Sequence, residues 1–173
     1  MKKITTFMFV IAVSFMNAQA YKGKGDIKGQ AGAIFQSGAT GIGVSADFGL
    51  GENMSYGFVA SYLLSVQENL IVTDGVNVDL KSPKFTDRAD IKVRFNANLG
   101  SVIGLDKKMD VYPGLNLGLR NLGGQVGFRY FFTEGFGVFG EAGFPIAKYD
   151  KTITGFDTYN NQFAFTAGAS FNL

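Results

Sequence analysis

Apolar and polar residues alternate with a period of two along almost the whole chain. In one segment, for example, Met54, Tyr56 and Phe58 alternate with Ser55 and Gly57. Successive side chains of a β-strand point to opposite faces, so this pattern predicts strands with one apolar and one polar face. Eight such strands are expected, at residues 24–36, 41–50, 54–66, 88–100, 110–120, 125–132, 136–148 and 161–173.

Eight antiparallel strands with two distinct faces favour a closed up-and-down barrel, because closure removes the unpaired edges of a sheet. We therefore expect an all-β fold without helices. An even number of strands leaves both chain ends on one side, with the segments 67–87 and 150–160 on the other. The link 101–109 fits either a loop or two strand extensions. Pro113 lacks a ladder donor and is expected near a rim or a bulge.

The apolar face indicates which way round the barrel is built. It carries Phe, Tyr or Leu on nearly every strand, too much volume for the interior of an eight-stranded barrel. The other face is mostly Gly, Ser, Asn and Thr, which suits a narrow lumen. Apolar-face aromatic residues gather near strand ends, as at membrane interfaces: Phe48, Tyr56, Phe58, Phe132, Phe136 and Phe171 at one end, and Phe35 and Phe163 at the other. The sequence predicts a transmembrane barrel, and a soluble periplasmic lipocalin-like carrier is the alternative.

The first twenty residues have the order of a secretory signal peptide. Lys2 and Lys3 precede a short apolar core, and Ala18-Gln19-Ala20 fits a cleavage site. We expect a signal peptide at 1–20 and a barrel at 21–173. Without the two lysines the chain has 14 basic and 14 acidic residues, so its charge gives no argument for a nucleic-acid partner.

The chain has no cysteine and no histidine. Disulfides, thiolate or imidazole metal sites and histidine-based catalysis are therefore excluded. Nothing marks any two of Asp90, Asp110 and Glu141 as a catalytic pair. The G-x-G-x-x-G spacing at 135–140 lies inside a predicted strand, whereas a dinucleotide fingerprint opens a helix. We expect no enzyme, cofactor or metal.

Five stretches carry a family resemblance: FVASYLLSV (58–66), RFNANLGSV (94–102), DVYPGLNLGLRNLG (110–123), RYFFTEGFGV (129–138) and YNNQFAFTAGASFNL (159–173). Together with the strand plan, they resemble small eight-stranded outer-membrane barrels and an uncharacterised Bacteroidetes family of such proteins. The resemblance covers essentially the whole chain after the signal peptide. It implies an outer-membrane location and no known activity.

Charged residues occur at intervals along the polar face and are expected inside the lumen. Six are positive and five negative: Lys28, Arg88, Lys92, Arg94, Arg120 and Arg129, with Asp26, Asp47, Asp90, Asp110 and Glu141. Charges removed from bulk water must be paired, so a salt-bridge network that plugs a narrow barrel is favoured over an ion or proton pathway. The candidate network is Lys28, Asp47, Asp90, Lys92, Arg94, Arg129 and Glu141.

The segment 67–87 is the main exposed element. Asp74-Gly75 is a hairpin signal between two apolar-rich runs. The hairpin is expected to protrude beyond the membrane, either as a solvated extension or as an edge that binds an extracellular protein by strand addition.

The function predicted from the sequence is an outer-membrane barrel with a plugged lumen, in contact with membrane lipid and serving a structural or surface-interaction role. A narrow channel or transporter for small or hydrophobic solutes is the alternative within the membrane.

Overall fold

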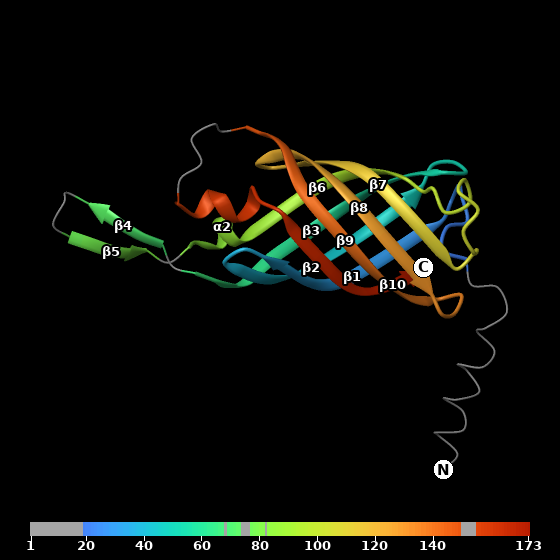
Figure 1. Cartoon of the computed structure of the whole chain (residues 1–173), viewed down its shortest axis with the longest axis horizontal. Helices are drawn as coiled ribbons and strands as arrows, with labels where there is room; N and C mark the ends of the chain where they lie inside the picture. The colour runs from blue at the N-terminus through green and yellow to red at the C-terminus, as the bar shows by residue number, and fades with distance from the viewer. Residues whose placement is uncertain (1–18, 68, 74–76, 82, 150–154) are drawn as a thin grey trace, which may run out of the picture.

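Eight antiparallel strands form one closed barrel, which confirms the fold class predicted from the sequence (Figure 1). The structure is a computed structural model that describes residues 19–67, 69–73, 77–81, 83–149 and 155–173. Around the barrel the order is β1-β10-β9-β8-β7-β6-β3-β2. These strands are β1 (Ile27–Gln36), β2 (Ala39–Gly49), β3 (Met54–Val66), β6 (Ala89–Ala97), β7 (Met109–Gly118), β8 (Asn121–Phe131), β9 (Phe136–Lys148) and β10 (Ala164–Asn172).

Two short helical segments depart from the expectation of strands alone. They are α2 (Phe85–Arg88) and the 3-10 helix η1 (Gly155–Asn160), which follow the long segments at one end of the barrel. The last strand begins at Ala164 rather than at 161, with three residues between its start and the end of η1. The link between β6 and β7 is a loop of turns, in which the Met109 amide donates to the Asp106 carbonyl (2.8 Å).

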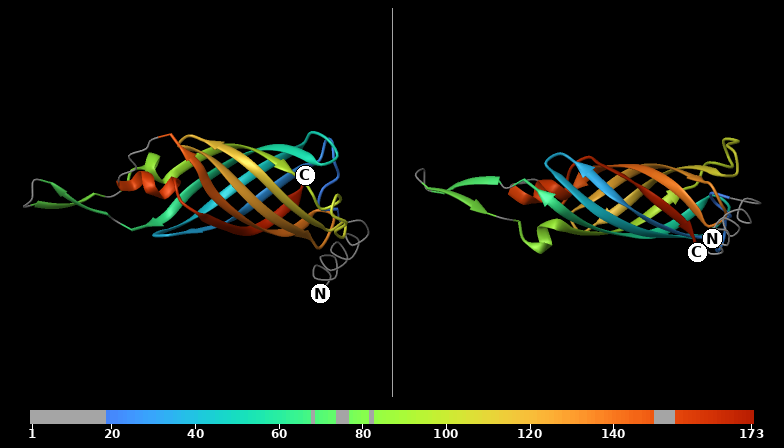
Figure 2. Two further views of the ribbon diagram at one scale, coloured as in Figure 1. Left: turned by 45° about the horizontal axis from the view of Figure 1, so that its top comes forward. Right: turned by 90° about the horizontal axis from the view of Figure 1, so that it is seen from below.

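The two ends of the barrel differ in their connections (Figure 2). The terminal end carries the C-terminus and the turns at 50–53, 98–108 and 132–135. The hairpin end carries α2, η1 and a separate two-stranded sheet of β4 (Asn69–Thr73) and β5 (Asn77–Lys81). The paired strands agree with the predicted hairpin, while its predicted turn residues Asp74 and Gly75 lie outside the described residues.

Pro113 lies in the middle of β7, where β7 pairs with β8 without a register shift. On its other side, β7 pairs with β6 from Gly118 back to Gly114, whose partner is Asn96. This ladder stops there and does not include Pro113, the next residue towards the N-terminus. The Leu99 amide then donates to the Val111 carbonyl beyond this gap (2.9 Å). Pro113 therefore lies at the end of a ladder rather than at a rim or a bulge. Proline has no backbone N–H to donate, and a position without a partner on the neighbouring strand does not need one.

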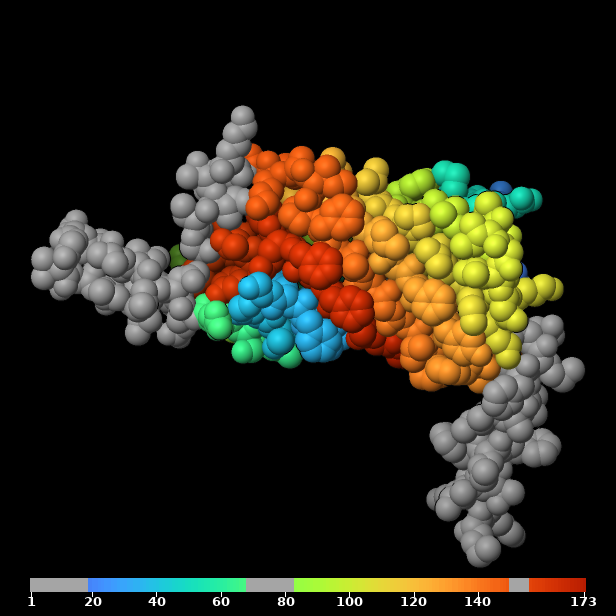
Figure 3. Space-filling model, in the orientation of Figure 1, coloured from blue at the N-terminus to red at the C-terminus, as the bar shows by residue number. Residues whose placement is uncertain are grey.

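Burial is inverted relative to a soluble protein. Among the described residues, 16 polar or charged side chains are buried, against eight hydrophobic ones. Large apolar side chains of the barrel strands are instead exposed on the outer wall, for example Phe58 (50%), Val126 (47%) and Leu117 (57%). The space-filling view shows this wall as a continuous surface over β9 and β10 (Figure 3). The apolar face thus points outwards, as the alternation predicted.

Aromatic rings at the terminal end form two contact chains on the outer wall. One joins Phe48, Tyr56 and Phe58, with ring centroids 5.3 and 6.4 Å apart. The other runs through four rings whose successive centroids lie 5.1, 6.2 and 5.8 Å apart, namely Tyr130, Phe132, Phe136 and Phe171. Aromatic clusters of this kind are typical of the interface between lipid and water.

The segment before β1 folds across the terminal end. The Tyr21 hydroxyl donates to the carbonyls of Gly51 (2.9 Å) and Met54 (2.5 Å). Ala20 is fully buried against Phe131. No helix among the described residues is long and apolar enough to cross a bilayer.

Candidate functional site

The lumen contains all seven residues of the candidate network, at positions where the strand alternation turns them inwards. Arg94, Arg129, Asp47 and Glu141 are connected by ion pairs, whereas Lys28 pairs with Asp26 and Lys92 pairs with Asp90. Two other cations expected in the lumen lie outside the barrel strands, at the hairpin end. Arg88 ends α2, and Arg120 lies between β7 and β8, where it pairs with Asp157 and lies 3.9 Å from Asp87. The strands predicted to carry these two residues are shorter than expected, because β6 begins at Ala89 and β7 ends at Gly118.

Arg94 on β6 is the centre of the first group. Its Nε and Nη2 donate to the two carboxylate oxygens of Asp47, each at 2.6 Å. Its Nη1 donates to Glu141 Oε2 at 2.9 Å, across the lumen. Nη2 also reaches Gln30 Oε1 and Ser45 Oγ, each at 2.9 Å. A guanidinium offers five donors in a fixed plane, and here it links β6 to β1, β2 and β9.

A glycine allows Arg94 to reach Asp47. The two residues lie on β6 and β2, and Gly57 of β3 is the register neighbour of both. A Cβ at Gly57 would collide with Asp47 Oδ1. The missing side chain leaves a path across β3, so the ion pair joins strands that are not adjacent.

Arg129 on β8 is the centre of a second group and is fully buried. Its Nη2 donates to Asp110 Oδ2 (2.7 Å) and to Asn98 Oδ1 (2.6 Å). Its guanidinium carbon lies 4.6 Å from the centroid of the Tyr112 ring, a cation–π arrangement. Nη1 lies 3.8 Å from Asp47 Oδ2, so Asp47 is shared between Arg129 and Arg94.

Lys28 forms a third group, nearer the terminal end. Its Nζ is 2.6 Å from Asp26 Oδ2 and 5.3 Å from the centroid of the Phe131 ring. Lys28 and Asp47 are register neighbours on β1 and β2, yet neither is the other's ion partner. Adjacency in the sheet therefore does not decide which charges pair.

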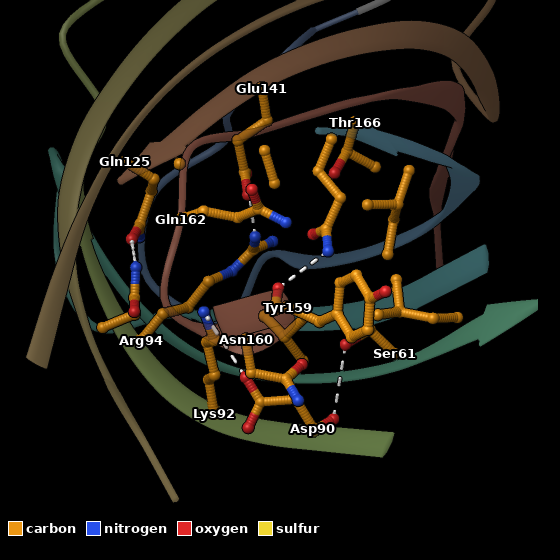
Figure 4. Close-up of a pocket in the computed structure, with 17 residues that line it drawn as sticks. Ser61, Asp90, Lys92, Arg94, Gln125, Glu141, Tyr159, Asn160, Gln162 and Thr166 are labelled. Atoms are coloured by element: carbon orange, nitrogen blue, oxygen red, sulfur yellow. Dashed lines mark hydrogen bonds and ion pairs between the residues drawn. The ribbon is translucent and has the colours of Figure 1, made fainter. Parts of the chain in front are cut away.

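A cavity of about 100 Å³ occupies the lumen at the hairpin end, and is called the chamber below (Figure 4). Arg94 and Glu141 line its inner part, and Asp90 and Lys92 line one wall. Lys92 Nζ is 3.5 Å from Asp90 Oδ2. The chamber lining thus mixes charged and polar side chains with the apolar side chains of Ile34, Val59 and Leu63.

The 3-10 helix η1 covers the chamber. Tyr159 is buried (6% exposed) and packs with Ala39 and Leu63 at the barrel mouth. The Gln36 side chain donates to the Tyr159 carbonyl (2.7 Å). The Asn121 side chain donates to the Asn160 carbonyl (2.6 Å). The two bonds tie η1 to β1 and β8, and the packing of Tyr159 adds contacts with β2 and β3.

Several buried lumen residues were not singled out from the sequence. Tyr112, Phe131 and Phe139 are apolar or aromatic, yet they lie inside at 0%, 0% and 8% exposure. Strict alternation would have predicted them, because each lies two positions from an inward-facing charged residue of the same strand. A Cβ at Gly127, the register neighbour of Tyr112, would collide with the Tyr112 ring. The glycine therefore makes room for the largest ring in the lumen.

The described residues hold no group of three or more Asp or Glu side chains placed to bind a metal ion. The arrangement is therefore one of paired charges on a closed strand framework, with a small chamber at one end.

Comparison with known proteins assigns the chain to a family. Residues 9–173 match the model of a family of unknown function, DUF6646. The chain belongs to this family. No curated protein matches it. The solution NMR structure of Outer Membrane Protein G from Pseudomonas aeruginosa is similar at 12% identity and a TM-score of 0.45, covering 88% of this chain and 99% of that one. The family of unknown function agrees with the resemblance seen in the sequence, and the Bacteroidetes origin stays a prediction.

We expect the substitution Arg94→Met to lower the free energy of unfolding by about 3–5 kcal/mol, because it leaves Asp47 and Glu141 without their shared cation in a buried site. Urea unfolding in detergent micelles measures the change. The matched control is Arg120→Met at the rim, where a partly exposed pair contributes about 1 kcal/mol or less. Equal losses for the two variants would contradict the central role of Arg94.

Proposed function

We propose that this protein is an outer-membrane β-barrel, exported by its N-terminal signal peptide, with a closed lumen and a structural or surface-interaction role. The observation that carries the proposal is the inverted burial: apolar side chains on the outer wall and ion pairs inside. In hydrocarbon every backbone polar group needs an internal partner, and a closed barrel provides one. The soluble-carrier alternative needs an apolar interior, whereas most of the buried side chains among the described residues are polar or charged.

The membrane location has a direct test. Expressed in a Gram-negative host, the chain is expected to fractionate with outer membranes. Unboiled protein is expected to migrate differently from boiled protein on a detergent gel, because a closed barrel resists unfolding until heated. Recovery in the soluble periplasmic fraction would contradict the proposal, and the same gel on urea-unfolded protein is the control.

The closed lumen is supported by the groups around Arg94 and Arg129. Their guanidinium groups bind carboxylates from β2, β7 and β9, which fills the middle of the barrel with side chains. An eight-stranded barrel is just wide enough to be filled in this way. Both mouths are also covered, by η1 at one end and by the segment before β1 at the other. This packing favours a plug over the narrow-channel alternative.

The substitution Arg129→Ala distinguishes a plugged lumen from an ion-conducting channel. We expect it to lower the free energy of unfolding by about 3–5 kcal/mol, since Asp110 loses its buried partner. Neither wild type nor variant should conduct steadily in planar bilayers, because Arg94, Tyr112 and Gln30 still span the lumen. Lys92→Met, at a partly exposed wall position, is the control. A large gain in conductance with little loss of stability would favour an ion pathway.

The surface role rests on the β4–β5 hairpin. It is a two-stranded sheet outside the barrel, paired from Asn69–Lys81 to Thr73–Asn77. Both of its outer edges are free of the barrel sheet, and a free strand edge can accept an added strand from another protein. The barrel would then serve as an anchor that presents this sheet at the cell surface.

Deletion of residues 68–81 tests this role. We expect intact cells carrying the deletion to lose adhesion to protein-coated surfaces, while the barrel keeps its heat-dependent migration because no barrel strand is removed. The full-length chain expressed at the same level is the control. Unchanged adhesion in a folded deletion variant would leave the hairpin as a solvated extension.

A further inference from the structure

The loop between β6 and β7, residues 98–108, presents two large apolar side chains to its surroundings. Val102 is 60% exposed and Ile103 is 57% exposed, and together they are called the apolar pair below. The loop projects past the end of the barrel, so the pair is not part of the outer wall that the strands form (Figure 2, right). Water disfavours adjacent exposed apolar side chains, and an apolar partner that covers them is therefore favoured.

The backbone of the loop holds the apolar pair in place. The Leu105 amide donates to the Gly100 carbonyl (2.9 Å), and this bond spans the pair. Inside it, the Gly104 amide donates to the Ser101 carbonyl (3.4 Å). Gly104 has a φ of 71°, in the left-handed region that favours glycine. These features form a Schellman motif, a common end of a helical turn. The apolar pair is thus presented on a turn whose backbone bonds are made within the loop.

Two lysines, Lys107 and Lys108, follow the apolar pair at the base of the loop. The Lys108 carbonyl accepts the Phe131 amide (2.8 Å), which attaches the base to β8. The Asp106 carboxylate accepts the Lys108 amide (2.8 Å). Two ammonium groups against one carboxylate give the loop a positive charge. An apolar tip with lysines behind it is typical of a segment in the membrane interface, where long lysine side chains reach the headgroups.

The loop also lies at an interruption in the aromatic rings of the terminal end. One contact chain of rings belongs to β2 and β3, and the other belongs to β8, β9 and β10. In the barrel, β6 and β7 lie between β3 and β8, and neither of these two fully described strands adds a ring to either chain. Their outer faces at this end carry Ala97 and Val111. The other interruption is at β1, where the exposed Leu173 lies beside Gly29. The apolar pair is therefore placed where the belt of rings expected at a lipid–water interface lacks one.

We propose that the β6–β7 loop is a membrane-interface anchor whose partner is an anionic phospholipid surface. The apolar pair enters the boundary between headgroups and acyl chains of the leaflet at the terminal end, and Lys107 and Lys108 bind phospholipid phosphates there. This inference rests on the membrane location proposed above. The positive charge and the position beside the aromatic belt favour a lipid surface over a periplasmic protein. Such an anchor limits the tilt and the depth of the barrel in the membrane.

A single introduced tryptophan reports where the loop lies, because the chain contains none. The variants Val102→Trp, Glu52→Trp and Val126→Trp are refolded into vesicles of phosphatidylcholine and phosphatidylglycerol with brominated acyl chains, which quench tryptophan fluorescence on contact. We expect strong quenching for Val102→Trp. Glu52→Trp, at an exposed polar position in another turn of the same end, is the matched control and should show little. Val126→Trp on the outer wall should be strongly quenched and tests the membrane location itself.

These outcomes separate the anchor from the membrane location. Quenching of Val126→Trp without quenching of Val102→Trp would overturn the anchor and leave the location standing, and it is the result expected for a protein partner. Equal quenching of Glu52→Trp and Val102→Trp would also overturn the anchor, because any tryptophan at this end would then enter the interface. An unquenched Val126→Trp would overturn both.

Further changes in the Val102→Trp background assign the contacts. Ile103→Asp should reduce quenching to the level of Glu52→Trp, because a carboxylate is costly to bury in hydrocarbon. Lys107→Gln combined with Lys108→Gln should reduce quenching in vesicles with phosphatidylglycerol and remove its sensitivity to salt, since screening acts on charge pairs. Lys24→Gln, at another exposed lysine of this end, is the control and should change neither. Quenching unchanged by Ile103→Asp would overturn the anchor, and quenching unchanged by the two lysine substitutions would overturn the phosphate contacts.

Discussion

A narrow barrel with an apolar outer wall has only one place for its charges. They lie in the interior, and the interior of eight strands has room for few side chains. Each charge in the lumen therefore needs a partner within reach. The bidentate contact of Arg94 with Asp47, extended to Glu141, meets this requirement and joins three strands, β6, β2 and β9, that are not neighbours in the sheet.

Space for these contacts comes from residues without side chains. Gly57 lets the Arg94 side chain cross β3, and Gly127 leaves room for the Tyr112 ring that Arg129 covers. The high glycine content of the chain thus has a specific cause in the lumen, where large and absent side chains face each other across neighbouring strands. The same logic explains the spacing at 135–140: Gly137 faces the lumen beside Phe131, and no helix follows to hold a phosphate.

The lumen is polar but not uniformly satisfied. Among the described residues, buried polar atoms without a partner lie at both ends, with Asp90 Oδ1 and Asn116 Oδ1 towards the hairpin end and Ser170 Oγ and Asn172 Oδ1 towards the terminal end. Between them, the ion pairs of Arg94 and Arg129 connect β2, β6, β7, β8 and β9.

The sequence by itself determined the barrel, the number of its strands and the outward direction of its apolar face, because side-chain alternation is local and persists along each strand. It also indicated which charges point inwards within strands. Only the tertiary structure decided which of them pair, since Arg94 reaches a carboxylate 47 positions away through a register and a glycine gap that alternation does not encode. It also decided where the strands end. Arg88 and Arg120 continue the alternating pattern, yet Arg88 lies in α2 and Arg120 lies between β7 and β8, where contacts with α2 and η1 rather than alternation decide its partners.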